Sequence, residues 1–143
     1  MRYLLDVNLL VAWGWADHAD HDRVAAWIGH VMRGGTDTLL TSAIPELGFV
    51  RVSVQRAGGR ISPEAAGRTL AGMLAHLGAR HGFLPDDQPA TGWPEWCRGA
   101  GQTTDAHLAS LAARHQARLA TLDTAIPGAF VLPVRPRKDR TAG

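Results

Sequence analysis

The chain of 143 residues has a formal charge of +2, a sequence pI of about 9.3 and 45% hydrophobic residues, as expected for a single globular domain with its own core. No apolar run reaches the ~20 residues of a membrane span, and the run after Arg2 is too short for a signal peptide, so we expect a cytoplasmic protein with no membrane role. The single cysteine, Cys97, excludes an internal disulfide and a cysteine metal site. The mildly basic balance is compatible with a nucleic-acid partner.

The first predicted strand covers Tyr3–Leu5 and ends abruptly at Asp6. A helix is predicted directly behind it, with Asn8 as a plausible N-cap. Open α/β sheets bind ligands at such strand-to-helix turns. Asp6 is therefore either a functional carboxylate or only a cap for the helix, and the choice depends on whether other acids arrive at similar turns.

Helical and extended patterns alternate along the rest of the chain. Helices are predicted over 20–32, around Pro45 to Gly58, over 62–80 and over 103–115, and strands over 38–41, 82–85, 119–122 and 130–132. Ser62 and either Thr103 or Thr104 are predicted N-caps. This order predicts an α/β fold with a parallel sheet covered by helices on both faces. We expect one domain over 1–134, followed by a basic, disordered tail over 135–143.

Four carboxylates share one kind of location. Asp6 and Asp123 end predicted strands, whereas Glu46 and Asp105 lie in the first turns of predicted helices. These positions gather on one edge of a parallel sheet, so the four acids could converge on one pocket. Singly, an acid in a first turn is explained by the helix dipole, worth about 0.3–1 kcal/mol. Four carboxylates within about 6 Å would repel by roughly 3 kcal/mol per pair and would require cations or raised pKa values.

The type of ligand indicates which cation such a cluster would take. Oxygen ligands without cysteine or an obvious histidine favour Mg²⁺ or Mn²⁺ over Zn²⁺. Mg²⁺ held by a few carboxylates and several waters is the usual arrangement for phosphate chemistry.

Four motifs carry a family resemblance, and they are Leu4-Leu-Asp-Val-Asn8, Glu46 with Gly48-Phe49-Val50-Arg51, Thr104-Asp-Ala-His-Leu108 and Leu119-Ala-Thr-Leu-Asp123. In this order the chain resembles PIN-domain proteins, and more closely the VapC-type toxins of bacterial toxin–antitoxin pairs, from Arg2 to about Leu132. The resemblance implies a PIN-like three-layer α/β/α sandwich and an Mg²⁺- or Mn²⁺-dependent endoribonuclease. It also implies a homodimer and a cognate VapB-like antitoxin that blocks the site.

The family's acidic quartet matches four positions of this sequence, Asp6, Glu46, Asp105 and Asp123. The three aspartates would hold the metal, and Glu46 would be a ligand or a base that positions water. Asn8 and Thr121 would orient the carboxylates. Whether one or two metals act is left open by the sequence.

Two further features each have two interpretations. The segment Asp17–Asp22 contains three acids and two histidines and resembles a metal cluster, but we interpret it as a solvated connection in which Asp20 caps the next helix. Arg51 either contacts substrate phosphate or forms a surface ion pair.

Other functions fit the same acids less well. A receiver domain needs a lysine near the pocket, but Lys138 lies in the predicted tail. A haloacid-dehalogenase-type phosphatase needs a second aspartate two residues after the first, where this chain has Asn8. A catalytically inactive PIN-like binding partner, acting in a protein or RNA complex, remains the alternative that an RNA cleavage assay would separate.

Overall fold

In the computed structural model, residues 1–134 are described, and five parallel strands form one sheet in the order β3-β2-β1-β4-β5. The strands are β1 (Arg2–Leu5), β2 (Thr38–Ser42), β3 (His81–Leu84), β4 (Arg118–Thr121) and β5 (Phe130–Val131). The helices are α1 (Val7–Gly14), α2 (His21–Gly34), α3 (Ala43–Arg56), α4 (Pro63–Leu77) and α5 (Thr103–Arg114), with short 3₁₀ turns at Gly78–Arg80 and Ala100–Gln102. The predicted α/β fold with a parallel sheet is confirmed. The predicted tail, 135–143, lies outside the described residues.

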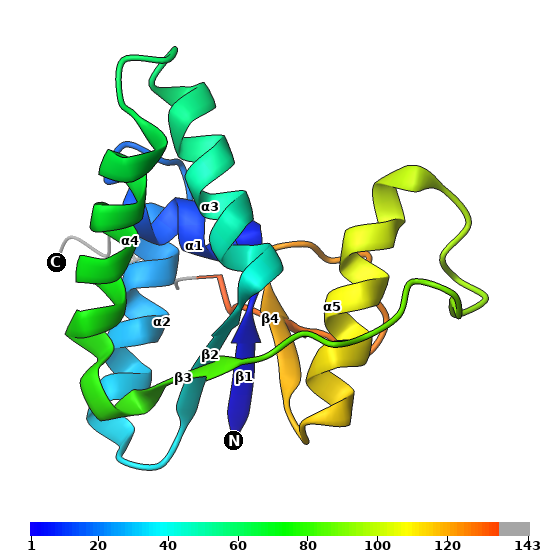
Figure 1. Ribbon diagram of the computed structural model, residues 1–143. Coiled ribbons are helices and arrows are strands. Elements are labelled where there is room, and N and C mark those ends of the chain that lie inside the picture. The colour runs from blue at the N-terminus through cyan, green and yellow to red at the C-terminus, as the bar shows by residue number, and fades with distance from the viewer. Residues whose placement is uncertain (135–143) are drawn as a thin grey trace, which may run out of the picture.

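The sheet separates two hydrophobic cores, because alternate strand residues point to opposite faces. On one face, Tyr3 and Leu5 of β1 pack with residues of α1 to α4. On the other face, Leu4 packs with Leu108 and Leu111 of α5. Figure 1 shows this division, with α1 to α4 on one side of the strands and α5 alone on the other. The predicted three-layer α/β/α arrangement is thus confirmed.

The order of the strands places a ligand-binding crevice at β1. The chain runs from β1 to β2 and β3 on one side of the sheet, and then returns to place β4 on the other side of β1. Open α/β sheets bind ligands where the strand order reverses, outside the carboxyl ends of the strands. Asp6 directly follows β1, and Asp123 lies two residues beyond β4.

Two predicted helix caps differ from the structure, and one agrees with it. Helix α1 is capped by Asp6, whose Oδ1 accepts a hydrogen bond from Val7 N at 2.7 Å, so Asn8 lies within the helix. Helix α5 continues directly from a 3₁₀ turn with Gln102 at its cap position, so neither predicted threonine caps it. Ser62 caps α4 as predicted, because its Oγ accepts from Ala65 N at 3.0 Å.

Helices α1 and α3 approach each other closely beside the crevice. A Cβ added to Gly48 would lie 2.6 Å from Cγ2 of Val7, which a real side chain cannot tolerate. Glycine at this position therefore lets the first turns of α3, including Glu46, pack next to the start of α1. Within residues 1–134, no helix is both long and apolar enough to cross a lipid bilayer.

Candidate active site

Asp6 is a buried carboxylate, with 4% of its surface exposed. One carboxylate oxygen caps α1 through Val7 N, and the other accepts the hydroxyl hydrogen of Thr121 at 2.8 Å. Burial raises the pKa of Asp6, and the Thr121 and Val7 hydrogen bonds oppose that shift because they stabilise the charged form. The two alternatives considered for Asp6 are therefore compatible, since it caps a helix and also projects a carboxylate into the crevice.

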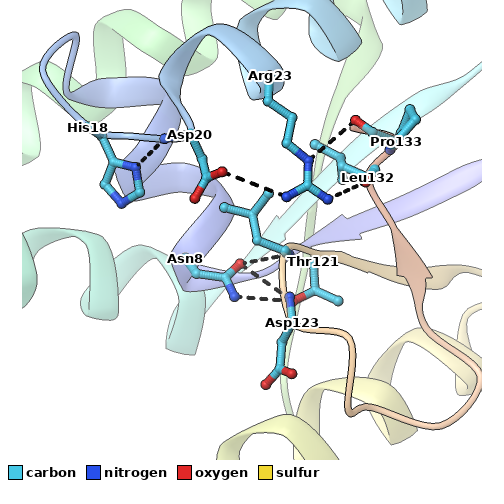
Figure 2. Close-up of polar contacts among 9 residues, drawn as sticks. Asn8, His18, Asp20, Arg23, Thr121, Asp123, Leu132 and Pro133 are labelled. Carbon is cyan, nitrogen blue, oxygen red and sulfur yellow. Dashed lines mark hydrogen bonds and ion pairs between the residues drawn. The ribbon is translucent and has the colours of Figure 1, made fainter. Parts of the chain in front are cut away.

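Thr121 and Asn8 form a small network beside Asp6. The Asn8 side-chain nitrogen donates to Thr121 Oγ1 at 3.2 Å, and its oxygen accepts from Leu122 N at 3.3 Å. Asp123 N also donates to Thr121 Oγ1, at 3.0 Å. Figure 2 shows Asn8 and Thr121 facing each other, with the Asp123 carboxylate turned away from both. Thr121 therefore contacts Asp6 directly, and Asn8 acts on that carboxylate only through Thr121.

Asp105 lies in the first turn of α5, and its pKa is affected by the charges of the other two aspartates. Burial, together with the smaller effects of the charges of Asp6 and Asp123, raises its pKa to about 6. Asp123 also raises the pKa of Asp6. Within residues 1–134, no three His, Cys, Asp or Glu side chains lie at the spacing of a ready-made metal site. The three aspartates are thus linked by their charges rather than by a ready-made ligand geometry.

Glu46 has different neighbours from the three aspartates. Its Oε2 accepts the hydroxyl hydrogen of Thr41 at 2.7 Å, and Thr41 Oγ1 also lies 2.7 Å from Nε2 of His81. The negative charge of Glu46 raises the pKa of His81, although burial lowers it by more. The structure therefore groups the aspartates and sets Glu46 beside β2 and β3.

Basic side chains line the same hollow as two of the acids. This hollow, called here the acid pocket, has a volume of about 460 Å³ and is lined by Asp6, Val7, Asn8, Val11, His18, Arg51, Val52, Arg56, Thr104 and Asp105. Arg51 is exposed and forms no ion pair within the described part of the chain. Of the two predicted alternatives for Arg51, a surface ion pair is therefore not the one observed.

Arg56 and His18 also line the acid pocket, and sequence reasoning did not identify either of them. Arg56 pairs with Asp17 at 3.2 Å and lies 5.1 Å above the ring of Trp15. His18 Nδ1 accepts a hydrogen bond from Asp20 N at 3.0 Å. The neutral His18 ring therefore carries its proton on Nε2, where it can donate to a ligand. Both positions depend on the fold of the connection between α1 and α2, which carries Asp17 and His18. No periodic pattern in the sequence predicts that fold.

The connection between α1 and α2 covers residues 15–20, so only the first four residues of the segment Asp17–Asp22 lie in it, and His21 and Asp22 lie in the first turn of α2. Asp20 occupies the N-cap position of α2, but its side chain makes no capping hydrogen bond and instead lies 3.7 Å from Arg23. Figure 2 shows Arg23 reaching from α2 to the backbone of Leu132 and Pro133. Arg23 thus fastens the end of the described chain to the helix that follows this loop.

The donor set fits a hard divalent cation. The three aspartates offer only carboxylate oxygens, which are the ligands that Mg²⁺ and Mn²⁺ prefer. Burial and the charges of Asp6 and Asp123 all raise the pKa of Asp105, as expected for a carboxylate that lacks a cation partner. A bound divalent ion would make the negative charges of these residues favourable. The site therefore suits a divalent cation.

Comparisons with known proteins agree with this fold. The PIN domain family model matches residues 3–129. Ribonuclease VapC39 of Mycobacterium tuberculosis is 37% identical over 132 residues, which cover 88% of this chain and 91% of that protein. Ribonuclease VapC44 from the same species is 38% identical over 142 residues, covering 90% and 94%.

A solved structure shares the fold at lower sequence identity. The crystal structure of VapBC2 from Rickettsia felis, bound to a DNA fragment from their promoter, contains a chain that aligns with a TM-score of 0.58. The alignment has 17% sequence identity and covers 92% of this chain and 97% of that one.

Proposed function

The chain belongs to the PIN-domain family, and we propose that it is the VapC-type toxin of a toxin–antitoxin pair, an endoribonuclease that hydrolyses RNA phosphodiester bonds with Mg²⁺ or Mn²⁺. The observation that carries the proposal is the coupling of Asp6, Asp105 and Asp123, which come from three separate segments of the chain. The identity to proteins named as VapC ribonucleases supports the RNA substrate. Cleavage would take place in the cytoplasm.

In this proposal Asp6, Asp105 and Asp123 hold the ion. The ion supplies an activated water and offsets the charge that develops on the phosphate. Thr121 keeps the Asp6 carboxylate oriented and charged through its hydroxyl, and Asn8 fixes Thr121 in turn. We assign Glu46, whose carboxylate accepts a hydrogen bond from Thr41, the role of orienting the attacking water and accepting its proton.

The basic rim of the acid pocket suits the RNA backbone. Arg51 offers a planar fork of N–H donors that matches phosphate oxygens. His18 offers one N–H donor, and the Arg56 guanidinium is held in place by Asp17 and Trp15. A phosphate between this rim and the three aspartates would have positive charge on one side and the ion on the other.

An antitoxin and a second copy of the chain complete the proposal. The R. felis structure contains VapBC2 with promoter DNA, and its fold is the basis for expecting a VapB-like partner here. We therefore propose a homodimer that binds a small antitoxin, which covers the acid pocket when the toxin is silent.

The test is RNA cleavage by the purified protein. RNA should be cut in Mg²⁺ or Mn²⁺ and left intact when EDTA is added. Replacement of Asp6 by Asn should abolish cleavage while leaving the circular dichroism spectrum unchanged. If no RNA is cut with either metal, the chain is instead the catalytically inactive binding partner that the sequence left as an alternative.

A further inference from the structure

A second hollow lies on the other side of α5 from the acid pocket. It has a volume of about 540 Å³ and is lined by residues of α5 and of the segment that follows β3. We call it the loop hollow, and its lining includes Gln88, Trp93, Trp96, His107, Ser110 and Pro127. Ala106 lines it, whereas the adjacent Asp105 lines the acid pocket. The two hollows therefore flank the first turn of α5.

Hydrogen bonds fasten the segment after β3 onto α5. The Asp86 carboxylate lies 2.6 Å from His107 Nε2, and both side chains are largely buried. Gln88 donates to the backbone oxygen of His107 at 3.0 Å and accepts from Ser110 Oγ at 2.8 Å. These contacts hold the wall of the loop hollow in place, so it is formed before any ligand arrives.

The lining offers flat apolar surfaces and a few polar atoms. Trp96 packs against the core beneath the sheet, whereas Trp93 leaves 44% of its surface exposed although it is a large indole. The Gln88 amide has a second N–H beyond the one given to His107, and Ser110 Oγ has free lone pairs. Among the described residues, neither Lys nor Arg lines this hollow, so it suits a neutral flat group better than a phosphate.

We propose that the loop hollow binds one unstacked nucleobase of the RNA strand whose phosphate lies in the acid pocket. The base stacks on Trp93 and its edge bonds to Gln88 and Ser110. Proteins read single-stranded RNA by stacking unpaired bases on aromatic side chains and bonding their edges. The inference rests on RNA being the substrate, and it adds a site that selects which base accompanies the cut bond.

The position of the loop hollow favours RNA over an apolar side chain of a protein partner. Its walls come from α5, which carries Asp105, and from the β4–β5 connection, which carries Asp123 and Pro127. The same two segments therefore contribute both to the loop hollow and to the proposed cation site. On this ground we place the neighbouring nucleotide of the bound strand in the loop hollow.

Binding of labelled RNA measures this site without cleavage. In EDTA, fluorescence anisotropy would record the affinity of the wild-type protein for 5′-labelled decamers of A, C or U and for decamers lacking bases. Stacking on one aromatic is worth about 1–3 kcal/mol, so Trp93→Ala should weaken the preferred decamer roughly 5- to 150-fold. Trp93→Phe should restore most of the affinity.

Phe83→Ala is the matched control, because Phe83 is also an exposed aromatic, with 51% of its surface accessible, and lines neither hollow. It should leave RNA affinity unchanged. The decamer without bases should bind wild type and Trp93→Ala equally. Equal binding of the base-containing decamers to wild type and Trp93→Ala would overturn the proposal. It would also be overturned if Trp93→Ala lost antitoxin binding but kept the RNA affinity of the wild type.

Cleavage is measured separately with wild type in Mn²⁺. If wild type cuts RNA but Trp93→Ala binds and cuts with the same base preference, the loop hollow is not a base site and the proposed function stands. If wild type cuts no RNA, the proposed function fails, and the anisotropy measurement alone decides whether the loop hollow takes a base.

Discussion

Thr121, the last residue of β4, donates its hydroxyl hydrogen to Oδ2 of Asp6 at 2.8 Å, and no surface of Thr121 is exposed. The bond joins the last residue of β4 to the residue that follows β1, 115 positions away in the sequence. It acts against the effect of burial, which raises the pKa of Asp6. Thr121 therefore helps a buried carboxylate to stay charged at the point where the strand order reverses.

Replacement of Thr121 by Val removes that donor and keeps the side-chain shape. The pKa of Asp6 should rise further, and Mn²⁺ affinity should fall about 10- to 100-fold, as for other residues that orient metal ligands. Leaving the buried carboxylate without its partner should also cost about 1–3 kcal/mol of unfolding free energy. Isothermal titration and urea unfolding measure the two effects. Thr121→Ser should retain both properties, and unchanged Mn²⁺ affinity in Thr121→Val would contradict the assigned role.

Replacement of Asp105 by Asn should stabilise the protein in EDTA. The folded pKa of Asp105 is about 6 and its unfolded pKa is near 3.9, so its charge opposes folding above pH 6. With allowance for solvent screening, we expect a gain of about 1 kcal/mol at pH 7.5 that shrinks as the pH falls toward 4. Urea unfolding across this range measures it. A loss of stability at pH 7.5 would show that the charges at this site are not repulsive.

The same pKa should appear in the pH dependence of cleavage. A metal ligand must be deprotonated, so a proton on Asp105 competes with the ion. At subsaturating Mn²⁺, kcat/KM should fall about tenfold per pH unit below pH 6, and saturating Mn²⁺ should move this fall to lower pH. A profile that stays flat between pH 5 and 7 at low Mn²⁺ would speak against Asp105 as a ligand.

Arg51 should affect substrate binding more than metal binding. Loss of one phosphate contact in Arg51→Ala should raise KM about 5- to 30-fold. It should also make the plot of log binding constant against log salt concentration shallower by ~0.7, the slope for one phosphate contact on a single strand. Arg68→Ala is the control, since Arg68 pairs with Glu64 on the exposed face of α4. Equal KM values for the two variants would exclude Arg51 from the RNA path.

Glu46 can be assigned as ligand or base by separating kcat from metal affinity. Because Glu46 bonds to Thr41 and does not line the acid pocket, we expect Glu46→Gln to lower kcat about 10²- to 10⁴-fold, the range for loss of a general base, with little change in Mn²⁺ affinity. A large loss of Mn²⁺ affinity would instead make Glu46 a ligand.

The sequence predicted the positions that short local patterns control. Asp6 and Asp123 were placed correctly because each follows a short apolar run that pairs as a parallel strand. Glu46 and Asp105 were placed in first turns, as observed. Asn8 was misplaced as a cap because both Asp6 and Asn8 are good capping residues, and the periodicity cannot separate helix starts two residues apart.

The remaining parts of the site depend on long-range packing. The contact between His81 and Thr41 requires the register of β3 against β2, which spacing along the chain does not fix. Arg56 reaches the acid pocket because Asp17 and Trp15 hold it there. His18 arrives on a loop without any repeating pattern. Such residues become visible only when the tertiary structure is known.

The central claim is that Asp6, Asp105 and Asp123 hold one cation site together. The most direct test is Mn²⁺ binding, followed by the electron paramagnetic resonance signal of the free ion, in wild type and in the three Asp→Asn variants, with Asp22→Asn on α2 as the control. We predict that each of the three variants weakens Mn²⁺ binding at least about tenfold, and that Asp22→Asn binds like wild type. Wild-type affinity in all three variants would contradict the claim.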